Sequence, residues 1–124
     1  MIGYVTLGTN DLDRAAEFYD AVLATINGSR MMEEEGFIAW TTAPGAPGLA
    51  ASKPFDGKTA TVGNGTMVAL QVDSPEAVTK LYEKAIELGA EDEGAPGPRG
   101  DTGFYAGYFR DLDGNKLNAF CITE

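Results

Sequence analysis

The side chains present in this sequence restrict the chemistry that it can carry out. Its 124 residues include no histidine, the commonest metal ligand and the commonest general base at neutral pH. Catalysis by a Ser-His-Asp triad or by a Cys-His pair is therefore excluded. The single cysteine, Cys121, falls in a β-prone segment and is interpreted as a buried apolar residue. Carboxylates remain as common metal-binding groups, and three of them are consecutive from Glu33 to Glu35.

The segment YAGYFRDLDGNKLNAFC, from Tyr105 to Cys121, has the pattern of a β-hairpin. Two β-prone runs, Phe104 to Arg110 and Lys116 to Ile122, flank the sequence Asp113-Gly114-Asn115. Asp-Gly supplies the positive φ angles that a tight hairpin turn requires. The pattern therefore predicts two antiparallel strands joined by this turn.

The predicted hairpin resembles the last hairpin of the vicinal oxygen chelate superfamily. That superfamily includes glyoxalase I, extradiol dioxygenases, fosfomycin-resistance enzymes and bleomycin-binding proteins. The segment YVTLGTNDLDRAAEFY, from Tyr4 to Tyr19, resembles the family's opening, so the match spans nearly the whole chain. The resemblance implies an α+β fold with two paired βαβββ modules, which form a half-open, eight-stranded mixed sheet around a central cavity.

Enzymes of this family draw metal ligands, typically His or Glu, from strands of both modules. The resemblance matches three of these positions to Tyr4, Met67 and Asn118, and a fourth to the range 49–52. None of these residues is a carboxylate or an imidazole, whereas a zinc-type centre takes about three imidazole, thiolate or carboxylate ligands. The triplet Glu33 to Glu35 is interpreted as a solvated strand end. We therefore predict that the metal site is lost, and we expect no cofactor.

Without a metal, the cavity would present a phenol, a thioether and an amide, which suit a flat, partly apolar molecule. Further candidates for the pocket are Trp40, Tyr105, Tyr108 and Arg99. The two tyrosines fall on opposite faces of one predicted strand, so one of them should reach the cavity. Arg99 could bind a carboxylate or phosphate from a loop. For the aromatic candidates, the competing interpretation is ordinary packing in the core. For Tyr4, Met67 and Asn118, it is that their side chains simply fill the cavity.

Three functions are compatible with these residues. The first is metal-independent binding of a small organic ligand in the sheet cavity or in a dimer cleft, as the resemblance to bleomycin-binding proteins implies. The second is a glyoxalase-like lyase, isomerase or dioxygenase-related enzyme with an atypical site. The third is a structural or regulatory dimer with a filled cavity. A homodimer is expected in each case, because exposed sheet edges need to be covered.

The elements that would position these residues occur twice in the same order, and a shift of 63 positions lays Tyr19 on Tyr82. The chain is predicted to be one domain, with modules at about 1–54 and 66–124 and a linker at about 55–65. The first module is expected to contain strands at 2–9, 30–35, 37–42 and 49–53, and a helix capped by Asn10. The second is expected to contain a strand at 66–72, a helix capped by Asp73 or Ser74, a short edge strand at 91–93, a loop at 94–101 and the hairpin.

The composition limits the partners. Nine basic residues against 19 acidic ones give a formal net charge of −10, which argues against nucleic acid and anionic membranes. No apolar run approaches the roughly 20 residues of a membrane-spanning helix. A basic segment followed by an apolar one, as in an export signal, is also absent, so we expect a cytoplasmic protein.

Overall fold

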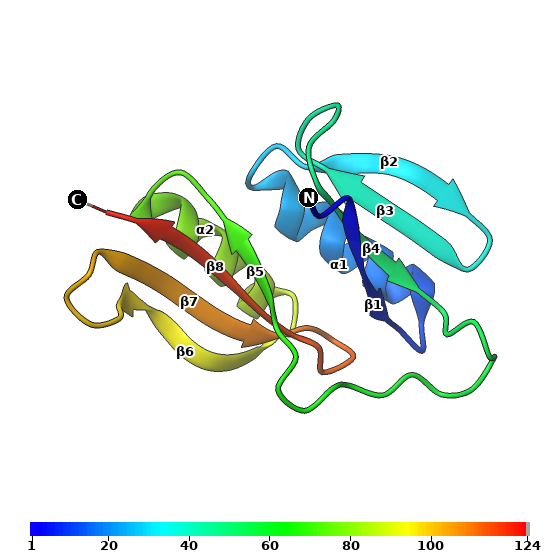
Figure 1. The fold of residues 1–124 in the computed structure, drawn as a ribbon. Helices are drawn as coiled ribbons and strands as arrows, with labels where there is room; N and C mark the ends of the chain where they lie inside the picture. The colour runs from blue at the N-terminus through cyan, green and yellow to red at the C-terminus, as the bar shows by residue number, and fades with distance from the viewer. Residues whose placement is uncertain (124) are drawn as a thin grey trace.

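The computed structural model describes residues 1–123 and contains two βαβββ units in sequence (Figure 1). The first consists of β1 (Tyr4–Gly8), α1 (Leu12–Ala24), β2 (Ser29–Glu34), β3 (Phe37–Thr41) and β4 (Gly48–Ser52). The second consists of β5 (Val68–Gln71), α2 (Pro75–Glu87), β6 (Glu91–Pro98), β7 (Phe104–Arg110) and β8 (Lys116–Ile122). The helices begin at positions 12 and 75, 63 apart, so the predicted repeat is confirmed.

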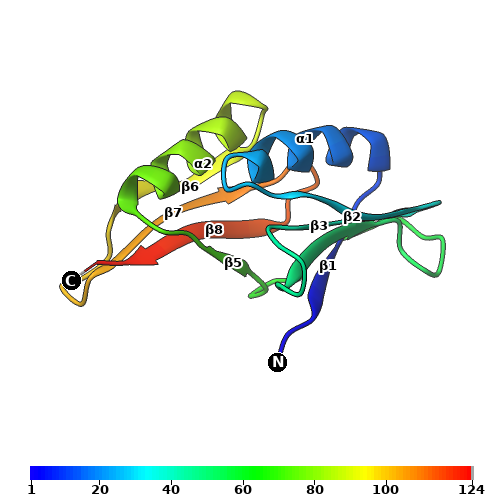
Figure 2. The same ribbon diagram turned by 90° about the horizontal axis from the view of Figure 1, so that it is seen from above.

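The eight strands are hydrogen-bonded as two four-stranded mixed sheets, in the orders β1-β4-β3-β2 and β5-β8-β7-β6. The first and last strands of each unit, β1 with β4 and β5 with β8, are parallel, and the other pairs are antiparallel. The edges formed by β1 and β5 face each other (Figure 1). Both helices cover the same side of this layer (Figure 2), which confirms the α+β fold with paired βαβββ modules.

The core lies between the helices and the sheets. Both helices carry apolar residues at intervals of three and four, so one face of each helix is buried. In the strands, alternate side chains point toward the helices. The larger of these core residues are Tyr19, Val22, Ile38, Trp40, Leu49, Val78, Leu81, Phe109 and Leu117. Within residues 1–123, neither helix is long and apolar enough to cross a membrane.

The N-terminal cap of α1 differs from the prediction. Asp11, not Asn10, caps this helix, because its extended backbone turns its carboxylate toward the first-turn N–H of Arg14. Asn10 instead binds the linker: its amide donates to the carbonyl of Ala60 at 3.2 Å and accepts from the N–H of Ala60 at 2.7 Å. Ser74, one of the two residues expected, caps α2.

Strand β6 is longer than predicted. The range 94–101 was expected to be a loop, but β6 continues to Pro98 and pairs with β7, with Gly94 opposite Tyr108. The pairing contains two register irregularities. Proline is tolerated in β6 because this strand forms the edge of its sheet, where some N–H groups need no partner strand.

Candidate functional site

Both helices lie on one side of the sheets, and we call the face of each sheet that points away from them the open face (Figure 2). It holds the three residues that the sequence matched to metal-ligand positions. Tyr4 lies in β1, is 59% exposed and belongs to the first sheet. Met67, just before β5, is 40% exposed, whereas Asn118 in β8 is only 1% exposed. No hydrogen bond joins any two of these side chains within residues 1–123, and Tyr4 belongs to a different sheet from Asn118, so the three do not form a closed cluster.

The open face of the first sheet carries aromatic and thioether side chains. The rings of Tyr4 and Phe37 meet edge to face, with centroids 6.1 Å apart. Gly48 lies beside Tyr4 and Met31: a Cβ atom there would be 3.0 Å from the Sδ atom of Met31 and 3.4 Å from Cβ of Tyr4. Met31 and Met32 are both exposed. This face therefore presents aromatic and thioether groups, with the carboxylate of Glu34 at its β2 edge, directly opposite Phe37.

The open face of the second sheet has a buried polar atom at its centre. Asn118 stands directly opposite Tyr108 in the antiparallel pair of β7 and β8, and beside Ala69 of β5. Its Oδ1 atom is buried and has no hydrogen-bond partner within residues 1–123. Buried polar atoms are nearly always hydrogen-bonded, so an orphaned acceptor marks a place where a partner is missing.

Two cations flank Tyr108 beside this orphaned acceptor. The guanidinium carbon of Arg99 lies 5.4 Å from the centroid of the Tyr108 ring, and Nζ of Lys116 lies 5.7 Å from it. Arg99 is held in place by the backbone, since its Nη atoms donate to the carbonyls of Ala95 at 2.7 Å and Gly97 at 2.8 Å. Neither cation forms an ion pair with a carboxylate in the part of the chain that the structure describes.

Trp40 and Tyr105, two of the pocket candidates, point away from the open faces. Trp40 is 1% exposed in the helix-side core, where its Nε1–H donates to Asp20 at 2.8 Å and its ring lies 5.5 Å from that of Tyr19. Tyr105 points to the helix side because it is three residues from Tyr108 along β7. Of the two tyrosines, Tyr108 is therefore the one on the open face.

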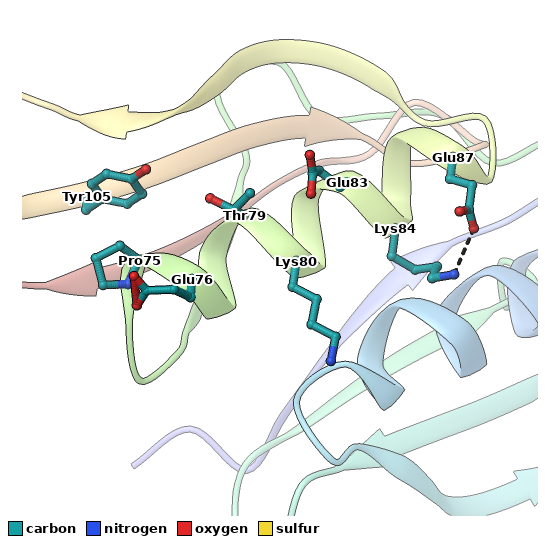
Figure 3. Close-up of a pocket in the computed structure, with 8 residues that line it drawn as sticks. All are labelled: Pro75, Glu76, Thr79, Lys80, Glu83, Lys84, Glu87 and Tyr105. Atoms are coloured by element: carbon teal, nitrogen blue, oxygen red, sulfur yellow. Dashed lines mark hydrogen bonds and ion pairs between the residues drawn. The ribbon is translucent and has the colours of Figure 1, made fainter.

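Two hollows lie on the helix side of the molecule. One, of about 450 Å³, follows α2 (Figure 3); Tyr105 enters it from β7, while Lys80 and Lys84 extend toward α1. The other, of about 640 Å³, lies between the start of α1 and the β2–β3 hairpin and is lined mainly by charged residues. Neither is lined by Tyr4, Met67 or Asn118. These two hollows and the predicted site are therefore on opposite sides of the sheets.

A second group of buried polar residues joins the two modules. The carboxylate of Asp111 accepts hydrogen bonds from the hydroxyl of Tyr19 at 2.5 Å and from Nδ2 of Asn115 at 3.0 Å. It also accepts from the backbone N–H groups of Asp113 and Asn115, each at 2.9 Å. The same Asn115 amide donates to the carbonyl of Gly8, at the end of β1. Burial, and then the nearby Asp111 charge, raise the pKa of Tyr19 well above its ordinary value.

The sequence did not predict this connection between modules. Asp111-x-Asp113-Gly114-Asn115 was interpreted only as a hairpin turn. The signal was present, because a two-residue turn needs only Asp-Gly, and the additional Asp and Asn are polar residues in a β-prone segment.

Comparison with known proteins identifies the family. A family model described as "Glyoxalase/Bleomycin resistance protein/Dioxygenase superfamily" matches residues 1–119. The chain belongs to this superfamily. The crystal structure of a glyoxalase/bleomycin resistance protein from Albidiferax ferrireducens T118 is 31% identical in sequence, with a TM-score of 0.91 over 99% of both chains.

Two more distant structures share the fold. One is a glyoxalase/bleomycin resistance protein/dioxygenase family enzyme from Burkholderia phytofirmans PsJN, at 20% identity and a TM-score of 0.77, with 98% of each chain covered. The other is the fosfomycin resistance protein FosX from Listeria monocytogenes, at 18% identity and a TM-score of 0.73, covering 99% of this chain and 93% of that one. No protein of curated function matches the chain.

Membership of the glyoxalase/bleomycin resistance superfamily raises the question of whether these residues fit a metal. The side chains of Tyr4, Met67 and Asn118 are a phenol, a thioether and an amide, which do not share a preference for any one metal. Glu33 is turned away, because it pairs with Arg30 at 2.7 Å and all of β2 is exposed. Residues 1–123 contain no group of three or more His, Cys, Asp or Glu side chains placed to hold a metal ion. This donor set does not fit a zinc-type centre.

Proposed function

We propose that this superfamily member binds a small organic molecule on the open face of the second sheet without a bound metal. The observation that carries the proposal is the buried Oδ1 atom of Asn118, which has no hydrogen-bond partner within residues 1–123. Leaving such an acceptor unpaired costs about 1–3 kcal/mol. A ligand that donates a hydrogen bond to Asn118 would recover this free energy on binding.

The chemistry of the surrounding side chains supports a ligand in place of a metal. Tyr108 and Ala69 flank Asn118 on the same face and offer a flat, partly apolar contact. Binding sites for small molecules typically combine such apolar surfaces with a few placed polar groups. The donor set, as described above, does not suit a zinc-type ion, so the proposal assigns Asn118 to the ligand itself.

A second copy of the chain is proposed to complete the site. The open faces carry a set of exposed apolar residues, namely Tyr4, Met31, Met32, Met67 and Ile122. Large apolar patches on a protein surface mark interaction sites. Because sites that bind small molecules usually bury most of the ligand, an open sheet needs a cover. A C₂ dimer would cover the open faces of both chains through one self-complementary interface.

The test uses protein without an affinity tag, since a histidine tag would supply the ligands that this chain lacks. Elemental mass spectrometry before and after incubation with Zn²⁺, Ni²⁺, Mn²⁺ and Fe²⁺ should find no stoichiometric metal. A screen of small aromatic compounds against ¹⁵N-labelled protein should shift the side-chain amide signal of Asn118. In a Lys80→Gln control on the outer surface of α2, the shifts should be unchanged. Stoichiometric metal, or a screen that moves no signal near Asn118, would count against the proposal.

An enzyme is the alternative that the same experiment separates. A glyoxalase-like lyase, an isomerase or a dioxygenase-related enzyme would convert a bound compound, and the NMR signals of that compound would change with time. Binding without conversion supports the binding function. If metal-free protein converts the compound and Asn118→Leu does not, the enzyme function is favoured over the binding function.

A further inference from the structure

We infer that the ligand of this open face is a planar carboxylic acid that also carries an O–H or N–H donor. This inference rests on the proposed function and names the ligand class for the same site. It combines the orphaned acceptor of Asn118 with the two cations, Arg99 and Lys116, that flank its neighbour Tyr108.

Strand geometry places these groups on one surface. Lys116 and Asn118 are two residues apart in β8, so their side chains share a face of the sheet. Tyr108 is directly opposite Asn118 in β7. Arg110, opposite Lys116, is the remaining cation here, but its Nε–H group already binds Glu93 at 2.9 Å. Arg99 and Lys116 therefore supply the positive charge that is available to a ligand.

The position of Arg99 is fixed before any ligand binds. Its Nη1 group donates to the carbonyls of Gly97 at 2.8 Å and Pro98 at 3.4 Å, and its Nη2 group donates to Ala95 at 2.7 Å. A guanidinium has five N–H groups, so Nε–H and one Nη2–H remain without a partner in the described residues. A carboxylate can accept from these N–H groups without displacing the bonds that hold Arg99 in place.

Gly94 provides the space for this arrangement. It lies opposite Tyr108 in the β6–β7 pair. A Cβ atom at this position would be 3.2 Å from Nη2 of Arg99 and 3.3 Å from Cδ1 of Tyr108. The absence of a side chain thus lets the guanidinium approach the ring, where the cation is stabilised by the π electrons of the aromatic face.

Arg99 and Lys116 are two of the five basic residues that form no ion pair within residues 1–123. Unlike the other three, which are Lys53, Lys58 and Lys80, these two lie against the ring of Tyr108 beside Asn118. Within residues 1–123, ion pairs neutralise Arg14, Arg30, Lys84 and Arg110. The chain has 19 acidic residues, yet none of those in residues 1–123 forms an ion pair with Arg99 or Lys116. Two cations without carboxylates next to a buried orphaned acceptor therefore indicate a site for a negatively charged group.

The acceptor of Asn118 restricts the ligand further. An ionised carboxylate has only acceptor atoms, so it can bind Arg99 and Lys116 but cannot satisfy the Oδ1 atom of Asn118. A second group, with an O–H or N–H donor, is required for that. The Tyr108 ring lies between these elements and favours a flat body that connects the acid to the donor.

The experiment compares three probes of one shape: 4-hydroxybenzoate, 4-methoxybenzoate and 4-hydroxybenzamide. The first has both the charge and the donor, the second lacks the donor, and the third lacks the charge. Titration of the ¹⁵N-labelled full chain at constant ionic strength should show the tightest binding for 4-hydroxybenzoate. Loss of a hydrogen bond to a charged group, or of the donor to Asn118, should each weaken binding about tenfold.

Three variants assign the contacts. Lys116→Gln and Arg99→Gln should each weaken 4-hydroxybenzoate about tenfold but leave the amide unaffected. Asn118→Leu should make the hydroxy and methoxy acids bind equally. Lys80→Gln, which removes a cation from α2, is the matched control and should change nothing. Fluorescence of the single tryptophan checks that each variant is folded.

The outcomes separate this inference from the proposed function. If the amide binds as tightly as the acid at Asn118, the ligand class is wrong and the binding function stands. The same holds if the acid binds but neither cation variant weakens it. If no probe shifts any signal on the open face up to its solubility limit, both the ligand class and the binding site are overturned.

Discussion

The hydroxyl of Tyr19 donates a hydrogen bond of 2.5 Å to the buried carboxylate of Asp111, although the two residues are 92 positions apart in the chain. Tyr19 belongs to α1 of the first module, and Asp111 follows β7 of the second. Asn115 extends the connection to the carbonyl of Gly8, at the end of β1. The turn that closes the last hairpin therefore also connects the second sheet to the first.

Removing the Tyr19 hydroxyl should destabilise the protein. Tyr19→Phe deletes one donor to a buried carboxylate that keeps its three other hydrogen bonds, so we expect a loss of about 1–3 kcal/mol in the free energy of unfolding. Urea denaturation followed by the fluorescence of Trp40 measures it. The matched control is Tyr82→Phe, at the repeat-related position, where the hydroxyl donates to exposed Asp92 at 2.6 Å within its own module. A loss no larger than that of the control would contradict a role for Tyr19 in joining the modules.

The same residue should make stability decrease at alkaline pH. Because the pKa of Tyr19 is raised in the folded state by burial and by Asp111, the folded protein keeps a proton that the unfolded chain releases above about pH 10. Stability from this group is complete below pH 10 and falls above it, by up to about 1.4 kcal/mol per pH unit. The advantage of the wild type over Tyr19→Phe should therefore shrink between pH 10 and 11.

Tyr82 sets the background for that measurement. Burial and the hydrogen bond to Asp92 raise the pKa of Tyr82 to about 12, so this residue adds its own loss above pH 10 in both proteins. Introducing Tyr82→Phe into both the wild type and Tyr19→Phe removes this contribution from the comparison. An advantage over Tyr19→Phe that stays constant up to pH 11 would contradict the alkaline prediction.

Local patterns predicted most of the fold and only part of the site. Residues spaced by three and four gave both helices, and Asp113-Gly114 gave the hairpin, because these features depend on neighbouring residues. The predicted end of β6 was wrong. Its Gly/Pro segment is extended only because it pairs with β7 as an edge strand, with Gly94 opposite Tyr108, and this pairing cannot be seen in the local sequence. Trp40 was a pocket candidate with core packing as the competing interpretation. It lies in the core, where its Nε1–H donates to Asp20, a contact that depends on how α1 packs on the sheet.

The open-face residues show the same limit. Alternation in β7 allowed either Tyr105 or Tyr108 to face the cavity, and only the position of α2 decides which. The contact of Arg99 with Tyr108 could not be anticipated, because it depends on the bulged path of β6 and on the absence of a side chain at Gly94. The resemblance placed Asn118 in the cavity, but its unsatisfied Oδ1 atom is visible only in three dimensions.

Replacing Asn118 by leucine should stabilise the protein. The side chains are similar in size, and the substitution removes a buried acceptor that has no partner, so a gain of about 1–3 kcal/mol is expected. Such a gain with loss of ligand binding is the trade-off expected of a functional residue. Thermal unfolding without ligand measures the change. Asn115→Leu is the control, because Nδ2 of Asn115 donates two hydrogen bonds, to Gly8 and Asp111, and their loss should destabilise the protein. Destabilisation by Asn118→Leu comparable to the control would mean that Asn118 has a structural partner.

Asp20 should stabilise the first module above acidic pH. The hydrogen bond from Arg30, and to a smaller extent that from Trp40, lower the pKa of its carboxyl below the usual value. A lowered pKa means that the folded protein releases this proton more readily than the unfolded chain does. The stabilisation is therefore present above about pH 4 and is lost as the pH falls through the folded-state pKa. Unfolding of the wild type and Asp20→Asn, followed by Trp40 fluorescence, should differ at pH 6 and converge near pH 2. A difference independent of pH would contradict this.

The exposed apolar residues of the open faces predict a dimer. Met31 is 50% exposed beside Tyr4 and Gly48, and nothing in the described chain covers it. If a second copy packs on this face, sedimentation velocity should show a dimer that Met31→Glu converts to a monomer, because a carboxylate cannot be buried there without a partner. Leu88→Glu is the control, since Leu88 is exposed at the end of α2 on the helix side. Ligand affinity should fall with dimerisation in Met31→Glu, because the site would lose its cover. A wild-type monomer that binds the ligand with full affinity would show instead that the open face of one chain is sufficient.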